Sequence, residues 1–271
     1  MKMKNKFAST PYLLWAALFV IIPMVLVVYF ALTSQSGQFT LDNITAVGEY
    51  ADVFIRSLWL ALLATAICLL LGYPLAYIIA RSGKIAQRTL VMLLMLPMWM
   101  NFLLRTYAWM TLLEDNGLIN RFLGIFGLHW HIINTEGAVV LGMVYNFLPF
   151  MILPLYSVMT KLDKSILNAA RDLGASGWQV FYRIVFPLTV PGILSGVTMT
   201  FVPAVSTFVI SRLLGGGGNL LIGDLIELQI LGASYNLHAG AAMSLILMVV
   251  ILICMGLMNS LDDEEMEAMI V

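Results

Sequence analysis

Six long apolar stretches alternate with shorter segments that carry most of the charge. Each stretch can cross a hydrocarbon core about 30 Å thick as an α-helix that rises about 1.5 Å per residue. The stretches lack the alternating pattern of barrel strands, and helices satisfy their own backbone groups in lipid. We therefore predict transmembrane helices at residues 12–32, 57–80, 89–113, 138–159, 188–211 and 239–260.

The composition agrees with this pattern. The chain is 61% hydrophobic and 11% charged, whereas soluble domains are typically about 25% charged. Too few polar groups are present to cover a surface in water, so membrane lipid is the expected surrounding. The sequence predicts an all-α integral membrane protein with one transmembrane domain over residues 1–271.

The first apolar stretch also resembles a signal peptide, because three lysines precede it. Its apolar run is longer than a usual signal-peptide core, and Ala31-Leu32-Thr33 makes a poor cleavage site. We favour a helix that is retained.

Basic residues gather on one side of the predicted bundle. Ten lie in the N-terminal segment and in the second and fourth loops, namely Lys2, Lys4, Lys6, Arg81, Lys84, Arg88, Lys161, Lys164, Arg171 and Arg183. The opposite loops hold only Arg56, Arg121 and Arg212. Cytoplasmic loops carry the excess of Lys and Arg, so both termini and these two loops are predicted to be cytoplasmic.

The motifs of common enzymes are missing from the sequence. No G-x-x-x-x-G-K-[ST] loop, H-E-x-x-H pair or G-x-S-x-G turn occurs, so we expect no catalytic residue and no ATP hydrolysis by this chain. Gly215–Gly218 is interpreted as a flexible outer turn. His129 and His131 could hold a metal weakly, but a solvated loop is favoured, so no metal site is predicted. Cys68 and Cys254 are expected to be buried thiols.

Seven of the nine prolines lie inside predicted spans, namely Pro23, Pro74, Pro97, Pro149, Pro154, Pro191 and Pro203. Each removes a backbone donor and can kink its helix, although membrane helices tolerate proline well. This distribution favours a bundle with a cavity or a moving part.

Residues 160–187 predict two short helices on the cytoplasmic side. Asp163 can cap the first, and Gly174 suits the left-handed position that ends it. Ser176 and Gln179 form an S-x-x-Q capping box for the second. Pro187 is expected to prevent simple continuation into the fifth span.

The first of these helices presents small residues. One apolar face is predicted to contain Ile166, Leu167, Ala169, Ala170 and Leu173. A hairpin lying in the lipid headgroups is one interpretation, but small residues suit close packing in a protein groove better. Ala170→Arg is therefore expected to uncouple the helix from a partner.

This segment resembles the cytoplasmic motif of ABC-importer permeases, E-A-A-x3-G-x9-I-x-L-P. The residues at the motif's positions are Asn168, Ala169, Ala170, Gly174, Ile184 and Pro187. Asn168 stands where the motif has Glu, and Phe186 stands where it has Leu. The resemblance implies a type I ABC-importer permease fold in which these residues couple the membrane domain to an ATPase.

Longer stretches resemble the spermidine/putrescine (polyamine) permeases of this family. They are LLLGYPLAY at 69–77, LPMWMNFLLRTYAW at 96–109, LPFMILPLYSVMTKLDKSILNAARDLGAS at 148–176 and NLLIGDLI at 219–226. The resemblance implies a second permease subunit in a heterodimer, two ATPase subunits and an extracytoplasmic substrate-binding protein. It implies ATP and Mg²⁺ in the ATPase, no cofactor bound by this chain and no nucleic acid.

A polycation path would use carboxylates and aromatic faces. Eight acidic residues lie in predicted outer loops, namely Asp42, Glu49, Asp52, Glu114, Asp115, Glu136, Asp224 and Glu227. Asp224 and Glu227 are three apart, so they share a helix face, and Trp99 and Asn101 are further path candidates. Arg105 is the one charge deep in a predicted span and is interpreted as a structural ion pair or a gate.

Three alternatives remain open. The substrate could be iron(III), phosphate, sulfate or an opine-like compound. The chain could be an ion-driven secondary transporter, although such proteins usually carry Asp, Glu or His within their spans. It could also be a membrane scaffold that anchors an ATPase.

Overall fold

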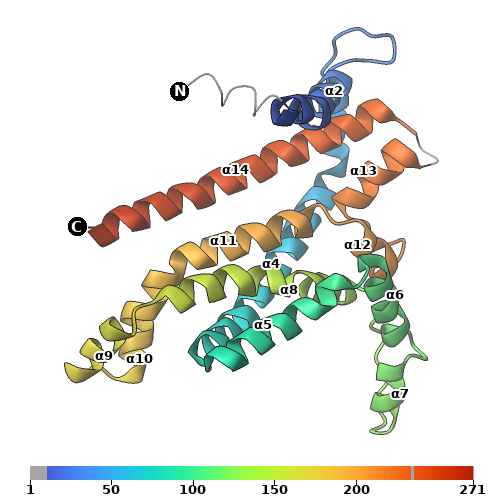
Figure 1. The fold of residues 1–271 in the computed structure, drawn as a ribbon. Helices are drawn as coiled ribbons and strands as arrows, with labels where there is room; N and C mark the ends of the chain where they lie inside the picture. Colours follow the sequence, from blue (N-terminus) through green and yellow to red (C-terminus); the bar gives the residue numbers. More distant parts are fainter. Residues whose placement is uncertain (1–10, 233–234, 271) are drawn as a thin grey trace, which may run out of the picture. The chain divides into compact units, whose positions relative to one another are not determined.

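The computed structural model is built from helices and describes residues 11–232 and 235–270 (Figure 1). In chain order the elements are η1 (Ala17–Ile21), α2 (Ile22–Ala31), α3 (Asp42–Ala46), η2 (Val47–Tyr50), α4 (Ala51–Arg81), α5 (Lys84–Trp99), α6 (Phe102–Leu113), α7 (Leu118–Gly124), α8 (Glu136–Lys161), α9 (Lys164–Asp172), α10 (Gly177–Val180), η3 (Phe181–Val185), α11 (Phe186–Val205), α12 (Val209–Leu214), α13 (Ile222–Leu231) and α14 (Leu237–Ile270).

Within the described residues, five continuous helical segments are long and apolar enough to span a membrane. They are Pro11–Ala31, Asp42–Arg81, Glu136–Lys161, Gly177–Val205 and Leu237–Met258. A sixth span arises if the bent pair Lys84–Trp99 and Phe102–Gly124 is counted as one. The predicted all-α membrane fold is confirmed.

The third predicted span, 89–113, is not one helix. It falls on α5 and α6, and the helical segments Lys84–Trp99 and Phe102–Gly124 meet at an angle of 88°. Met100 is extended, and the Asn101 side chain accepts a hydrogen bond from the Leu103 N–H at 2.8 Å. An amide that caps the first turn satisfies a backbone donor at a new helix start. Hydropathy is continuous across this point, which is why the sequence pattern concealed the break.

The fifth predicted span, 188–211, is displaced in the structure. The helix runs from Gly177 to Val205, and α12 follows as a separate short helix. Contrary to expectation, Pro187 does not interrupt it. The π-helical turn η3 lies directly before α11, and such wide turns accommodate a residue that cannot donate a backbone hydrogen bond.

The chain separates into two compact units. The first draws on Met1–Phe54 and Leu225–Leu252, and the second on Ile55–Asp224 and Ile253–Val271. In the first unit the helical segment Pro11–Ala31 exposes most of its apolar side chains, as a lipid-facing helix does. His238 Nδ1 lies 3.0 Å from the Phe30 carbonyl oxygen.

The core of the second unit lies among α4, α8 and α11. Cys68 and Ala76 of α4 are buried against Met151 and Leu155 of α8, which confirms the expected burial of Cys68. Cys254, by contrast, is only half-buried.

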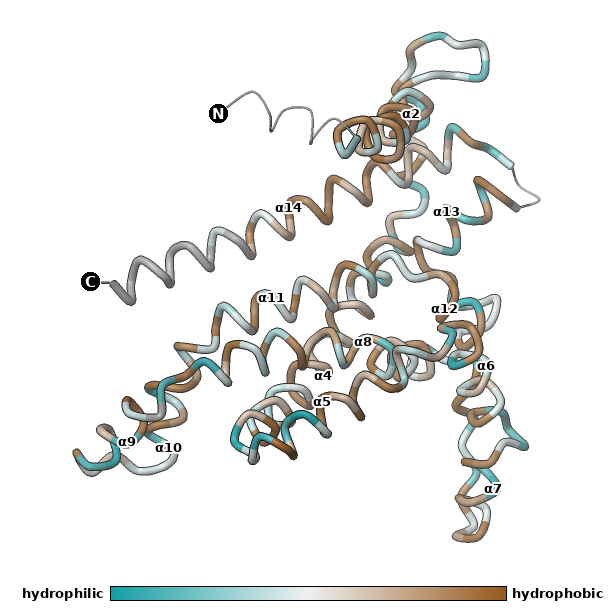
Figure 2. The backbone as a smooth tube through the Cα atoms, viewed as in Figure 1, coloured by the Kyte–Doolittle hydropathy of each residue, from teal (hydrophilic) through white to brown (hydrophobic). Residues whose placement is uncertain are grey.

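Glycines bring α11 close to α8. A Cβ at Gly196 would lie 3.0 Å from the Met151 carbonyl oxygen, and one at Gly192 would lie 3.0 Å from a Val158 methyl group. These two glycines form a G-x-x-x-G pair, a spacing that lets membrane helices approach closely. In Figure 1, α8 and α11 run side by side, with α9 and α10 at one end of the pair. Figure 2 shows hydrophilic residues gathered at α9.

Candidate functional site

The α9–α10 hairpin, residues 163–180, has the local structure that its sequence predicts. The Asp163 carboxylate accepts a hydrogen bond from the Ser165 backbone N–H at 2.8 Å and caps α9. Hydrogen bonds from the Ser165 backbone and then its side chain hold the pKa of the exposed Asp163 carboxyl below its ordinary value. The predicted N-cap is confirmed.

The turn between the two helices depends on Gly174. Its φ of +85° lies in the left-handed region, which glycine adopts without steric cost. The Ala175 N–H then donates to the Ala170 carbonyl oxygen at 3.0 Å. Ser176 and Gln179 form both hydrogen bonds of the predicted capping box, at 2.8 and 3.3 Å.

Only part of the predicted apolar face of α9 is buried. Leu167 is 6% exposed, and both Leu167 and the half-buried Ala170 pack in a cluster with Val180 and Val185. By contrast, the remaining three residues are exposed, namely Ile166, Ala169 and Leu173. The predicted apolar face is therefore buried only in part: Leu167 and Ala170 hold the hairpin together, and Ile166, Ala169 and Leu173 form its exposed part, called the outer apolar face.

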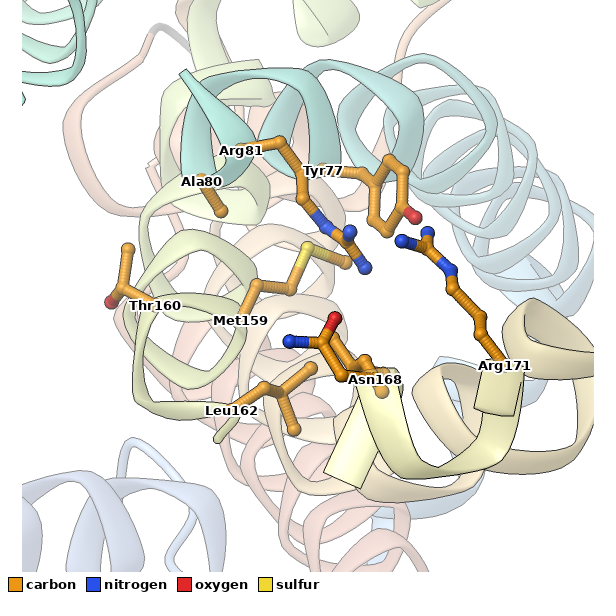
Figure 3. A pocket seen from close by; sticks show the side chains of 9 residues that line it. Tyr77, Ala80, Arg81, Met159, Thr160, Leu162, Asn168 and Arg171 are labelled. Atoms are coloured by element: carbon orange, nitrogen blue, oxygen red, sulfur yellow. The ribbon is translucent and has the colours of Figure 1, made fainter. Parts of the chain in front are cut away.

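The remaining motif residues also divide by burial. Ile184 is partly buried against the cluster around Leu167, and Pro187 is half-buried. Asn168 is exposed and lies on the side of α9 that faces the ends of α4 and α8, where it lines a cavity (Figure 3). Beyond the predicted face, Trp178 is 72% exposed and stacks on Phe181 at 5.7 Å between ring centroids.

The predicted path residues Trp99 and Asn101 lie on either side of a helix break. Trp99 ends α5 and is 70% exposed, and it lines the same cavity, of about 400 Å³, as Lys84 and Arg88. Asn101 uses its side chain to cap α6. The helix break at Met100 and Asn101 separates Trp99 from Arg105, although the sequence predicted both in one span, 89–113.

Arg105 is buried on α6. It is 8% exposed, and its guanidinium carbon lies 6.0 Å from the centre of the Phe102 ring. Its Nε and Nη1 groups find no hydrogen-bond partner among residues 11–232 and 235–270. A buried guanidinium with unsatisfied donors needs a carboxylate or carbonyl partner.

Asp224 and Glu227 occupy the same helix, α13, but differ in exposure. Asp224 is 1% exposed, and its Oδ2 accepts a hydrogen bond from the Leu221 N–H at 2.8 Å. Glu227 is half-buried. The burial of Asp224 favours a structural role at the start of α13 over direct contact with substrate.

Other sequence candidates receive simple structural roles. His131 Nδ1 lies 2.7 Å from the Asp115 carboxylate, and both side chains are exposed. The described part of the chain contains no group of three or more metal-ligating side chains. The Gly215–Gly218 turn is held by Asn219, whose side-chain amide donates to the Asn134 and Gly215 carbonyl oxygens.

Sequence reasoning missed the cavity beside Asn168. It is formed by side chains from the end of α4, the end of α8 and α9. Arg81 and Arg171 served only to assign the orientation of the chain. Their shared environment depends on tertiary packing and leaves no local signal.

Residues 69–264 match the family model described as "Binding-protein-dependent transport system inner membrane component". The chain is 42% identical over 255 residues to the spermidine/putrescine transport system permease protein PotB of Escherichia coli K12, covering 90% of this chain and 91% of that protein. It is 39% identical over 267 residues to PotB of Haemophilus influenzae, covering 93% of each.

A solved structure is also similar. A chain of a bacterial ABC transporter involved in the import of the acidic polysaccharide alginate superposes with a TM-score of 0.78 at 19% identity. The match covers 96% of this chain and 95% of that chain. At this identity the likeness shows the fold alone, which is that of ABC-importer permeases.

Proposed function

This chain belongs to the family of binding-protein-dependent transport system inner membrane components, and we propose that it is a permease subunit of an ATP-driven importer of polyamines. The substrate class rests on the 42% identity to a spermidine/putrescine permease that covers nine-tenths of both chains. The outer apolar face of α9 carries the proposal that the chain is driven by a separate ATPase.

The coupling proposal follows from the two sides of α9. Leu167 and Ala170 fix α9 to α10 and η3, so the hairpin can move as one piece with α11. On the other side, Ala169 lies between two larger exposed residues, Ile166 and Leu173. A helix with this pattern fits an apolar groove on another protein, because the small residue allows close backbone approach.

The partners of this subunit are a second permease, two ATPase subunits and an extracytoplasmic binding protein. ATP and Mg²⁺ bind to the ATPase, and this chain binds no cofactor. ATP biases the transporter toward one state only through its different affinity for the two states, and the hairpin transmits that bias. The unsatisfied donors of Arg105 are consistent with a structural or gating charge that pairs with a group on the second permease.

The proposal also includes the orientation of the chain in the membrane and the residues that line the substrate path. The excess of basic residues supports a cytoplasmic position for the hairpin and both termini. Glu227 is the acidic path residue that the structure favours, because Asp224 is buried and hydrogen-bonded to the backbone. Trp99 offers an exposed aromatic face to an ammonium group, although two cations line the same cavity.

Competition of labelled spermidine uptake tests the substrate class. Cells that express the chain with its partner subunits should take up spermidine, and unlabelled putrescine should compete. Competition by phosphate, sulfate or iron(III), without competition by putrescine, would contradict the polyamine proposal. Uptake that continues after ATP depletion would contradict the importer proposal and favour an ion-driven carrier.

A further inference from the structure

A cavity of about 280 Å³ lies between the ends of α4 and α8 and the inner side of α9 (Figure 3). Arg81 enters it from the last turn of α4, and Arg171 enters it from α9. Figure 3 shows both guanidinium groups and the Asn168 amide directed toward the same space. The cavity therefore brings two positive charges and an amide together.

No described residue that lines the cavity neutralises this charge. None of the described residues that line the cavity is an aspartate or a glutamate. Neither Arg81 nor Arg171 has an ion-pair partner within residues 11–232 and 235–270. The Arg81 guanidinium carbon lies 4.7 Å from the centre of the Tyr77 ring, a cation–π contact that orients it without removing its charge. This arrangement suits an external anion with several acceptor oxygens.

An apolar groove begins where the basic cavity ends. It has a volume of about 490 Å³ and shares Tyr77 with the cavity. Its walls include Leu69, Tyr73, Phe181 and Ile193, so it follows α4 away from Arg81 along η3 and α11. From residue 81 to residue 69 a helix rises about 18 Å, close to the thickness of one leaflet of the hydrocarbon core, about 15 Å.

We infer that the cavity and the groove together bind one anionic phospholipid. The phosphate accepts hydrogen bonds from Arg81, Arg171 and the Asn168 amide, and one acyl chain lies in the groove beyond Tyr77. A free anion would fill the cavity but leave the apolar groove empty. A carboxylate from a protein partner could pair with the arginines, but it would not extend along α4 into the groove as an acyl chain does. Basic pockets between helices on the cytoplasmic side are suited to anionic headgroups.

The site has a consequence for α9. The inner side of α9 contributes Asn168 and Arg171 to the lipid site, while Ala169 is exposed on the outer apolar face. A bound lipid therefore links α9 to the end of α4.

Lipid binding to the purified full-length chain tests the inference. In detergent, phosphatidylglycerol is titrated against phosphatidylcholine, and bound lipid is counted by native mass spectrometry. The double variant Arg81→Gln/Arg171→Gln should weaken phosphatidylglycerol binding roughly ten- to thirty-fold. The matched control Lys84→Gln/Arg183→Gln removes two positive charges from the same side of the protein but outside the cavity, and it should change binding less than twofold.

A second variant tests the same site without removing an arginine. Asn168→Glu places a carboxylate beside both guanidinium groups and should displace the headgroup, with a similar loss of affinity. If the double variant fails to fold, the phosphatidylglycerol affinity of Asn168→Glu tests the proposed site in its place. Ile193→Trp fills the groove and should weaken phosphatidylglycerol while leaving any binding of glycerol phosphate unchanged.

Three results would overturn the inference. Equal losses in the cavity variant and the control would show general attraction to anionic lipid. Displacement of phosphatidylglycerol by an equal concentration of inorganic phosphate would show that the cavity binds a free anion. Equal affinity for phosphatidylcholine and phosphatidylglycerol would show that the arginines do not select the headgroup.

Discussion

At the residue scale, two neighbouring alanines of α9 serve different purposes. Ala169 is exposed on the outer apolar face, whereas Ala170 packs against Val180 and Val185 inside the hairpin. An arginine at 170 would disturb the fold of the hairpin as well as any contact with a partner. Residue 169 is therefore the site at which docking is tested without damage to the hairpin.

Ala169→Arg is expected to abolish most ATP-dependent uptake while the protein still reaches the membrane. The long charged side chain prevents close approach of the ATPase, and ATPase co-purification should fall at least tenfold. Ala169→Ser keeps a small side chain and should retain both ATP-dependent uptake and ATPase co-purification. Equal co-purification of the ATPase with the two variants would contradict the proposed docking face.

Asp163 predicts a pH dependence for α9. Its lowered pKa means that the ionised cap contributes stability above the ordinary value of an unfolded aspartate, about 3.9. That contribution is lost as the pH falls through the still lower value of the folded state. Hydrogen-exchange protection in the first turn of α9, corrected for intrinsic rates, should hold down to about pH 4 and then decline.

Asp163→Asn is the control for this measurement. Asparagine also caps helices but does not ionise, so the decline at low pH should disappear. The same decline in both proteins would mean that another group causes it.

The two acidic residues of α13 should respond differently to substitution. Glu227→Gln is expected to raise the KM for spermidine by up to about fivefold, the effect of losing one partly exposed ion pair.

Asp224→Ala leaves the buried Leu221 N–H without its acceptor and should lower the free energy of unfolding by about 1–3 kcal/mol. Uptake kinetics and thermal unfolding separate the two effects. An unchanged KM in Glu227→Gln would remove that residue from the path.

At the element scale, the turn after α9 depends on one backbone conformation. Gly174 and Gly177 both have open space around the position of a Cβ atom, and only Gly174 has a positive φ. Gly174→Ala should therefore destabilise the hairpin by about 1–2 kcal/mol, the cost of a left-handed residue with a side chain. Gly177→Ala, at the start of α10, should be neutral or slightly stabilising. Hydrogen exchange in the α9–α10 hairpin measures the stability of both variants. Equal destabilisation by the two substitutions would contradict the claim that the positive φ of residue 174 requires glycine.

Local signals in the sequence predicted the helix ends, because each end is made by neighbouring residues. Asp163 and the Ser176–Gln179 pair cap helices within three residues of themselves. The break at Asn101 was also marked by a capping residue, but the apolar residues on either side outweighed it. At Pro187 the prediction failed because a π-helical turn is not encoded by a simple spacing.

Burial could not be predicted in the same way, because it depends on helices from distant parts of the chain. The spacing of α9 identifies its apolar residues but not which of them meet Val180 and Val185. Similarly, Arg81 and Arg171 lie on helices far apart in the sequence, and only the fold brings them to one cavity.

At the scale of the whole molecule, the hairpin is continuous with a spanning helix. Gly177–Val205 runs without a break from the second short helix of the hairpin through α11, and α11 packs on α8 through Gly192 and Gly196. In the proposed mechanism, a displacement of α9 is passed to α8 and α11 through this close-packed backbone. This continuity is the physical basis of the proposed coupling between nucleotide binding and transport.

The most direct test is ATP hydrolysis by the reconstituted complex of this chain with its second permease, ATPase and binding protein. We predict that spermidine-loaded binding protein stimulates hydrolysis severalfold with the wild-type chain and that Ala169→Arg abolishes the stimulation. Hydrolysis that is stimulated equally in the two complexes would contradict the central claim that α9 transmits the signal.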